Sequence, residues 1–225
     1  MSHPLCLLFD CDGTLVDSEP LLADVMADAL TRAGLPFTAP QYMEEFRGVR
    51  FANIVAELEQ RFGPLDDAIR NAAEAEMRRA MQLRMSTELK PIPGVREALD
   101  RLTEHPRCVA SNGPEHKIRR ALDSTGLRAY FGDSLYSGYA IERWKPDPGL
   151  FLHAARDMGV TPERCVVIDD ADVGVAAGLA AGMRTIHINR FPERETTPEG
   201  AIALHDMRDL PSAVARLGQV EAVLH

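Results

Sequence analysis

Residues 5–15 of the chain read Leu5-Cys6-Leu7-Leu8-Phe9-Asp10-Cys11-Asp12-Gly13-Thr14-Leu15. An apolar run that ends in turn-forming residues predicts a buried strand of a parallel sheet. Asp10 would then lie at the carboxyl end of this strand, where open α/β sheets place their ligands. Asp10 and Asp12 would point the same way if strand geometry continued that far, and their repulsion would require a cation or a proton. The alternative is a strand followed by an ordinary acidic turn, since Asp and Gly are common turn residues.

The composition of the 225 residues is that of a globular protein, with 45% hydrophobic and 26% charged residues and a formal net charge of −9. This acidic balance argues against a general nucleic-acid-binding protein. The sequence has no run of about 18 apolar residues and no signal-peptide pattern, so we expect no membrane span and no secretion. The spacing of its four cysteines does not suit a zinc site, and we expect reduced, buried thiols in a cytoplasmic protein.

Two segments of different character follow the first strand. Residues from about 18 to 88 carry apolar side chains at helical spacing, and residues 90–94, Lys-Pro-Ile-Pro-Gly, predict a stiff connection without regular structure. Helix and strand patterns alternate after that, with strands expected near 108–110, 134–136, 165–168 and 185–188. We therefore expect an α/β fold: a Rossmann-like parallel sheet core (1–16 and 89–225) with an inserted all-helical cap domain (17–88), which would form a lid over the carboxyl edge of the sheet.

The helix expected after residue 168 carries Gly174, Gly178 and Gly182 along one face. Glycines spaced by four residues also occur where membrane helices pair, but this stretch is short and contains Asp172. We expect instead that the small residues let this helix lie close to the sheet.

Four polar groups are expected at or near the carboxyl ends of predicted strands. They are Asp10 with Asp12, Ser111 with Asn112, Lys145, and Asp169 with Asp170. Each group has an ordinary alternative, as a solvated turn lysine or as a helix cap. Two acids directly after four apolar strand residues are, however, costly without a cation. Carboxylates suit Mg²⁺, and an ammonium with helix-start amides suits a phosphate, so the combination predicts phosphoryl transfer.

These residues resemble the four motifs of the haloacid-dehalogenase-like hydrolase superfamily, in its helical-cap branch related to β-phosphoglucomutase. The motifs occur in order as Asp10-Cys11-Asp12-Gly13-Thr14, Ser111-Asn112-Gly113, Lys145-Pro146-Asp147-Pro148 and Asp169-Asp170. The resemblance covers the chain to about His187. Residues 135–139 and 143–148, together with Ser111-Asn112-Gly113-Pro114, are similar to bacterial phosphatases that act on 6-phosphogluconate.

The resemblance implies a role for each motif residue. Asp10 would be the nucleophile that takes the phosphoryl group as an aspartyl phosphate. Asp12 would protonate the leaving alkoxide and then help to deprotonate the water that hydrolyses the intermediate. Ser111 and Lys145 would hold the non-bridging phosphate oxygens, assisted by backbone amides near Asn112 and Asp12.

The resemblance also implies a Mg²⁺ site. Its ligands would be Asp10, the backbone carbonyl of Asp12, and Asp170, with Asp169 binding directly or through water. The acid at position 12 and the second acidic pair argue against a true dehalogenase, which needs no metal.

In this branch the second segment of the cap reaches the substrate. Here that segment is Arg47-Gly48-Val49-Arg50, with Asn53 one turn later, and Glu19 at the hinge is a further candidate. Two arginines suit an anionic or polyhydroxylated substrate such as a sugar-acid phosphate. The alternative is that they are surface arginines of a loop.

The sequence therefore predicts a Mg²⁺-dependent phosphatase of small phosphorylated metabolites, with 6-phosphogluconate as the leading substrate. One alternative is a β-phosphoglucomutase-like phosphosugar mutase, which would use the same site. Another is a non-catalytic relative that keeps the fold. We expect no nucleic-acid or membrane partner, and a monomer or weak homodimer.

Overall fold

The computed structural model describes residues 4–47 and 49–223, and the chain divides into two compact units. One unit comprises the residues up to Val16 and from Pro91 onward, and the other comprises Asp17–Lys90. The chain crosses between the units in two short strands, β2 (Val16–Asp17) and β3 (Lys90–Pro91), which pair as a small sheet. The expectation that residues 90 and 91 have no regular structure is therefore wrong. A proline is compatible with such an edge strand, where its missing N–H is not needed.

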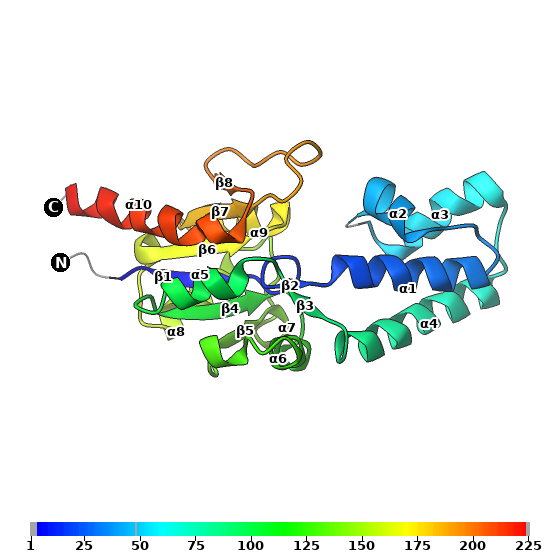
Figure 1. Cartoon of the computed structure of the whole chain (residues 1–225), viewed down its shortest axis with the longest axis horizontal. Helices are drawn as coiled ribbons and strands as arrows, with labels where there is room; N and C mark the ends of the chain where they lie inside the picture. Colours follow the sequence, from blue (N-terminus) through cyan, green and yellow to red (C-terminus); the bar gives the residue numbers. More distant parts are fainter. Residues whose placement is uncertain (1–3, 48, 224–225) are drawn as a thin grey trace. The chain divides into compact units, whose positions relative to one another are not determined.

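The first unit is built on a parallel sheet whose strand order, within the described residues, is β5-β4-β1-β6-β7-β8 (Figure 1). Its strands are β1 (Cys6–Phe9), β4 (Arg107–Ser111), β5 (Leu135–Ser137), β6 (Cys165–Asp169), β7 (Arg184–Ile188) and β8 (Ile202–Leu204). In the central strand, Leu8 pairs with Cys108 of β4 on one side and Val167 of β6 on the other. Both β1 and β6 are buried along their length, as their apolar runs predict. The parallel α/β core is confirmed.

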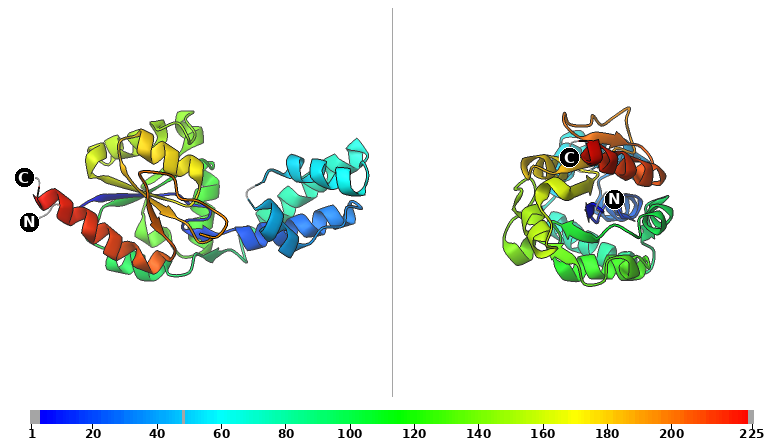
Figure 2. Two further views of the ribbon diagram at one scale, coloured as in Figure 1. Left: turned by 90° about the horizontal axis from the view of Figure 1, so that it is seen from above. Right: turned by 90° about the vertical axis from the view of Figure 1, so that its left-hand side faces the viewer.

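Helices cover both faces of this sheet, with α8 and α9 on one face and α5 and α10 on the other (Figure 2). The helices of the unit are α5 (Val95–Arg101), α6 (Glu115–Ser124), α7 (Gly138–Ile141), α8 (Gly149–Asp157), α9 (Asp172–Ala180) and α10 (Leu210–Val223). Three short 3₁₀ turns add η2 (Arg128–Tyr130), η3 (Pro162–Arg164) and η4 (Met207–Asp209). On the α8–α9 side, Phe151 and Ala154 pack with Leu8 and Val167. Each fully buried Leu or Phe contributes roughly 1.5–3 kcal/mol, so this packing fixes where the strands end.

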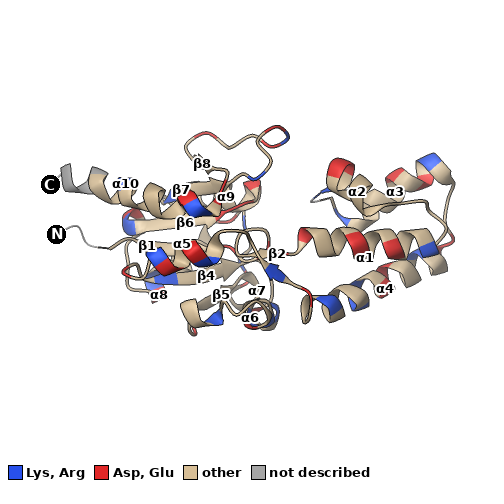
Figure 3. Cartoon of the chain, viewed as in Figure 1, with Lys and Arg blue, Asp and Glu red and all other residues tan. Residues whose placement is uncertain are grey.

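The second unit is a helical bundle. Its elements are α1 (Glu19–Arg32), α2 (Ala39–Gln41), the π-helical turn η1 (Tyr42–Phe46), α3 (Phe51–Phe62) and α4 (Asp67–Met85). Leu30, Tyr42, Ile54 and Leu58 form the centre of its core. Charges of both signs lie along α1, α3 and α4 (Figure 3). Between α1 and α3, the helical turn α2 continues directly as the π-helical η1.

Two further elements of the first unit follow the last strand that the sequence predicts. β8 adds an edge strand, although two of its three residues are exposed, and α10 packs against α5. Among the described helices, none combines the length and the apolar character that crossing a membrane requires.

Candidate active site

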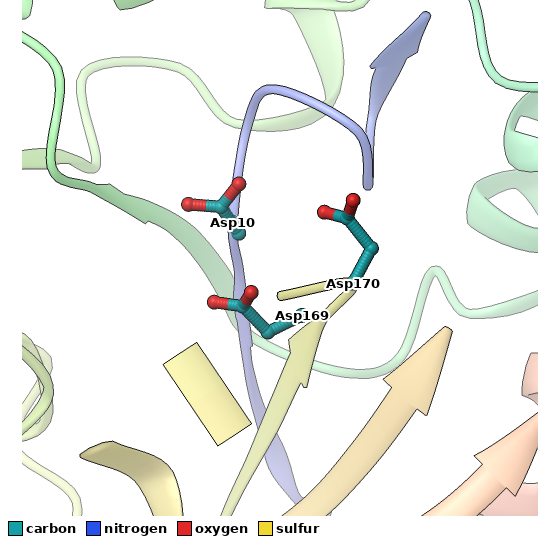
Figure 4. Close-up of side chains that lie close together, drawn as sticks. All are labelled: Asp10, Asp169 and Asp170. Atoms are coloured by element: carbon teal, nitrogen blue, oxygen red, sulfur yellow. The ribbon is translucent and has the colours of Figure 1, made fainter. Parts of the chain in front are cut away.

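Three carboxylates lie together at the carboxyl edge of the sheet. Asp10 follows β1, Asp169 ends β6, and Asp170 comes next. Because β1 and β6 are parallel neighbours, both ends lie at the same edge of the sheet. Each of the three acids offers one oxygen atom, and these atoms lie within 4.8 Å of one another (Figure 4).

The ammonium of Lys145 is held between two of these acids. Its Nζ lies 2.5 Å from Asp10 Oδ1 and 2.8 Å from Asp169 Oδ2, and the lysine side chain is 2% exposed. The same ammonium lies 4.9 Å from the centre of the Phe151 ring. Asn112 fixes the lysine backbone, because its Oδ1 accepts from the Lys145 N–H at 2.8 Å and its Nδ2 donates to the Lys145 carbonyl at 3.2 Å. The lysine is thus fixed at its backbone by the turn after β4 and at its ammonium by the acids.

Burial determines the electrostatics of this cluster. Desolvation raises the pKa of Asp10 to about 7, with the charge of Lys145 opposing and that of Asp169 adding to the rise. Burial also acts to lower the pKa of Lys145, but the two carboxylates outweigh it and hold that pKa above its ordinary value. Three acids with one ammonium remain short of positive charge, so the cluster favours a further cation.

A divalent metal ion fits this set of residues. Carboxylate oxygens are the ligands that hard divalent cations take, and the acids that converge here are buried or half-buried. Asp10 and Asp170 would hold such an ion together with the backbone carbonyl of Asp12. Asp169 already accepts the Ala171 N–H through Oδ1 at 3.0 Å and Lys145 through Oδ2, which favours an indirect contact through water.

Two glycines let the backbone approach these acids closely. Gly13 has φ +90°, and a Cβ atom there would lie 2.1 Å from Asp170 Oδ2. In α9, a Cβ on Gly174 would lie 1.8 Å from Asp169 Oδ2. The sharp turn expected at Gly13 is present, and its tight approach to an acid excludes a side chain.

Asp170 is also fixed from two sides. The Thr14 hydroxyl donates to Asp170 Oδ1 at 2.9 Å. His187, buried in β7, has Nε2 3.1 Å from the Asp170 carbonyl oxygen and Nδ1 2.9 Å from Thr197 Oγ1. Since a carbonyl only accepts, Nε2 carries the proton, and the threonine hydroxyl donates to Nδ1.

Asp12 lies apart from the carboxylate cluster that the described residues form. The strand ends at Phe9, so the alternation of side-chain directions along a strand does not determine where Asp12 points. Asp12 instead forms an isolated bridge with Val16. Lys117 of α6 lies with its Nζ 2.9 Å from Asp12 Oδ2. Between the two acids, burial and the negative charges of Asp12 and Asp10 raise the pKa of the Cys11 thiol. Cys11 is therefore a neutral thiol, not a competing nucleophile.

Ser111 ends β4 beside this cluster. It is buried, and its Oγ accepts from the Gly113 N–H at 3.2 Å. The turn after Ser111 leads into α6, which begins at Glu115. Ser111 and the Lys145 ammonium, assisted by backbone amides of this turn and near Asp12, remain the predicted phosphate-binding groups.

The candidate substrate residues of the helical unit are placed as follows. Arg50 and Asn53 are exposed at the start of α3, and Arg47 is half-buried directly after η1. Glu19 begins α1, and its Oε2 accepts from the Tyr42 hydroxyl at 3.2 Å. Gly48 lies outside the described residues.

Sequence reasoning assigned no role to Thr14, Lys117 or His187. Thr14 stands within the first motif, so the motif itself was a signal. His187 pairs with Asp169 in the register of β6 and β7, a signal that exists only once the strands are aligned. Nothing in the sequence connects Lys117 with Asp12, since 105 residues separate them.

Comparison with known proteins places this site in a family. The family described as haloacid dehalogenase-like hydrolase matches residues 5–182. The chain is 34% identical over 195 residues to 6-phosphogluconate phosphatase of Escherichia coli (strain K12), covering 87% of each protein. It is 34% identical over 186 residues to fructose-1-phosphate phosphatase of the same strain, covering 81% of this chain and 95% of that protein.

The solved structure of a related protein supports the same family assignment. A HAD family hydrolase from Deinococcus radiodurans R1, with bound phosphate and sodium, superimposes with a TM-score of 0.80 at 30% identity. The match covers 97% of this chain and 98% of that chain. The chain therefore belongs to the haloacid dehalogenase-like hydrolase family, and it is a phosphatase of that family.

Proposed function

We propose that the chain is a Mg²⁺-dependent phosphatase of small phosphorylated metabolites that works through an aspartyl phosphate on Asp10. The observation that carries the proposal is the contact of one buried ammonium, that of Lys145, with Asp10 and Asp169 beside a third acid. This arrangement supplies a nucleophilic carboxylate and positive charge at one point. Phosphoryl transfer depends mainly on such positioning and charge neutralisation.

In the first step, an Asp10 oxygen attacks phosphorus, and the bond from phosphorus to the leaving alkoxide oxygen breaks. Lys145 and the backbone amides after Ser111 stabilise the negative charge on the non-bridging oxygens. Asp12, in its acid form, donates a proton to the alkoxide as it leaves. The products of this step are the free alcohol and a phosphorylated Asp10.

In the second step, water attacks the phosphorus of the intermediate. Asp12, now a carboxylate, takes a proton from this water, and the bond between Asp10 and phosphorus breaks. Asp10 returns as a carboxylate, and inorganic phosphate leaves. A divalent cation on Asp10, Asp170 and the Asp12 carbonyl would supply charge neutralisation for both steps.

For the substrate we propose a sugar or sugar-acid phosphate, with 6-phosphogluconate first. The phosphatase relatives that act on 6-phosphogluconate and fructose 1-phosphate support this class. Arg47 and Arg50 would contact the anionic or hydroxylated part of the substrate, and Gly48, Asn53 and Glu19 are further candidates for substrate contact. The four cysteines, all buried and free, are compatible with the proposed cytoplasmic location.

The test is phosphate release from a panel of sugar phosphates, sugar-acid phosphates, phosphoglycolate and nucleotides, with and without Mg²⁺. We expect Mg²⁺-dependent release that is fastest with 6-phosphogluconate. Asp10→Asn should abolish turnover, because an amide is a poor nucleophile. Asp209→Asn, at an exposed acid of η4, is the matched control and should keep wild-type activity.

Several outcomes would contradict the proposal. Near-normal activity of Asp10→Asn would exclude Asp10 as the nucleophile. A requirement for a sugar bisphosphate, with isomerisation instead of phosphate release, would identify a mutase. Preference for a nucleotide or for phosphoglycolate by a wide margin would exclude the substrate class, and an inert, metal-loaded protein would exclude the enzyme.

A further inference from the structure

The two carboxylate oxygens of Asp12 have different surroundings. Oδ2 accepts from the Lys117 ammonium at 2.9 Å. Oδ1 is buried, and within the described part of the chain it has no hydrogen-bond partner. Leaving a buried acceptor without a partner is costly, so folded proteins rarely do so without a reason.

Lys117 reaches Asp12 from α6, the helix that follows β4, and β4 is the direct neighbour of β1 in the sheet. Lys117 is the third residue of α6, and its N–H donates to the Pro114 carbonyl at 2.9 Å. Its stem passes the turn after β4, since a Cβ built on Gly113 would lie 3.8 Å from Lys117 Cδ. Lys117 therefore links the turn that carries Ser111 to the loop that carries Asp12.

This ammonium is not shared with the carboxylate cluster in any contact between described residues. Lys145 is the cation that contacts Asp10 and Asp169, whereas the ion pair of Lys117 is with Asp12. The chain has three lysines, and the third, Lys90, lies in β3. The two acids of the first motif are thus each held by a different lysine.

We propose that Lys117 is a positioning residue: by holding Asp12 through Oδ2, it leaves Oδ1 free to exchange the proton of the reaction. This proposal rests on the proposed function. In the first step, Oδ1–H gives its proton to the alkoxide as the ester P–O bond breaks and the bond from Asp10 to phosphorus forms. In the second step, Oδ1 takes a proton from the attacking water as the bond between Asp10 and phosphorus breaks.

The alternative is that Lys117 binds the substrate directly, as a partly exposed lysine beside a phosphatase site could. The two roles differ in their kinetic effects. Removing a group that binds the substrate in the ground state raises KM, whereas misplacing the acid and base lowers kcat. A merely structural ion pair of two partly exposed groups would change neither kcat nor KM, and would contribute little to stability.

The first measurement compares three variants with the wild type. Lys117→Met keeps the length of the side chain and removes the ammonium, and we expect kcat to fall by about tenfold to a hundredfold with KM nearly unchanged. Lys117→Arg should restore part of kcat, because it can still donate to Oδ2. Arg120→Met removes an exposed cation from the same helix and should match the wild type.

The second measurement is a double-mutant cycle with Asp12→Asn. If Lys117 acts through Asp12, Lys117→Met should cause no further loss of kcat in the Asp12→Asn background. A full additional loss there, or an increase of KM with kcat unchanged, would overturn the proposal. So would wild-type kinetics of Lys117→Met.

A third measurement separates this proposal from the proposed function. If the wild type hydrolyses no ester on the panel, the proposed function fails, and Lys117 is judged by crystal structures of the wild type and Lys117→Met. Displacement of the Asp12 carboxylate in the variant would support positioning. An unmoved carboxylate would overturn it, and Lys117→Ala, which also removes the ammonium, serves in place of Lys117→Met if the latter does not fold.

Discussion

At the scale of single residues, Asp169 and Asp170 are neighbours with different surroundings. Both oxygens of Asp169 accept hydrogen bonds from the chain itself, one from Lys145 and one from the Ala171 N–H. Asp170 receives the Thr14 hydroxyl on its side chain and His187 on its carbonyl. Asp169 therefore orients the Lys145 ammonium, whereas Asp170 presents its carboxylate from a backbone that His187 holds in place.

His187 provides a residue-scale prediction. Replacing His187 with Phe keeps a buried ring and removes the donor to the Asp170 carbonyl, so the backbone of Asp170 loses a restraint. Partners behind the direct ligands typically contribute about 10–100-fold to metal affinity, and we expect a weakening of that order for Mg²⁺. The measurement is the thermal stabilisation of the protein as a function of Mg²⁺ concentration.

A second histidine serves as the control for this experiment. His205 also contacts a backbone carbonyl, that of Asn189, with its Nδ1 2.8 Å from the oxygen. His205 is exposed and is not in contact with the three clustered acids, so His205→Phe should leave the Mg²⁺ dependence unchanged. If both variants respond to Mg²⁺ like the wild type, His187 has no effect on the metal site.

At the scale of elements, α9 shows what a sequence pattern can predict about a helix and what it cannot. The spacing of its glycines predicts a helix that lies close to the sheet. Gly178 does so, since a Cβ there would lie 2.6 Å from Thr185 Oγ1 and 3.0 Å from Val167 Cβ. Gly174 instead makes room for the Asp169 carboxylate, and Gly182 lies beyond the end of the helix with φ +71°. Spacing alone could not separate packing, acid placement and chain reversal, because all three favour glycine.

The strands also differ in how well the sequence predicts them. β1 and β6 are predictable because both of their faces are buried, so their sequences are apolar up to the acids that follow. β8 lies at the edge with two exposed residues, and its sequence carries no such pattern. The loop before it is organised by Asn189, whose Nδ2 donates to the Glu195 carbonyl at 2.7 Å and whose Oδ1 accepts from the Phe191 N–H at 3.0 Å. Such side-chain contacts produce no periodic pattern in the sequence, so the conformation of this loop could not be predicted from it.

The placement of Gly174 leads to an element-scale prediction. Gly174→Ala would put a methyl group onto Asp169, so the carboxylate or the start of α9 must move. Overpacking of this kind typically costs about 1–3 kcal/mol, and displacement of a site residue by about 1 Å can lower turnover a hundredfold. We expect lower stability in chemical denaturation and at least a tenfold loss of kcat.

Gly218→Ala is the matched control, because Gly218 is also helical and a Cβ there meets no atom within 4 Å. It should raise stability by about 0.5–1 kcal/mol, as alanine does in a helix, and leave kcat unchanged. Equal kcat values for Gly174→Ala and the wild type would show that Asp169 tolerates the methyl group.

At the scale of the whole molecule, the chain carries its chemistry in one unit and its candidate specificity residues in another. All acids of the cluster, Lys145 and Lys117 belong to the sheet unit, whereas Arg47 and Arg50 belong to the helical unit. The motifs could be recognised in the sequence because every chemical role there demands one residue type. The arginines could not be assigned as firmly, since exposed arginines occur on many helical surfaces.

This division predicts that substitutions in the helical unit change substrate preference without changing the chemical step. Arg50→Met removes an exposed cation at the start of α3, where it would contact the body of a sugar-acid phosphate. A hydrogen bond to a charged group contributes about 1.5–3 kcal/mol, so kcat/KM for 6-phosphogluconate should fall about tenfold or more. With p-nitrophenyl phosphate, which lacks the sugar-acid body, kcat/KM should stay at the wild-type value.

Arg79→Met tests whether the effect belongs to this position or to the loss of any positive charge. Arg79 is an exposed arginine of α4, and its removal changes the net charge by the same amount. Because long-range attraction is screened beyond about 8–10 Å at physiological salt, an arginine that makes no contact with the substrate should affect neither substrate. An equal loss for both substrates in Arg50→Met would mean that Arg50 acts on the chemical step itself. An equal loss on 6-phosphogluconate for Arg50→Met and Arg79→Met would mean that net charge, and not a contact from Arg50, governs the capture of anionic substrates.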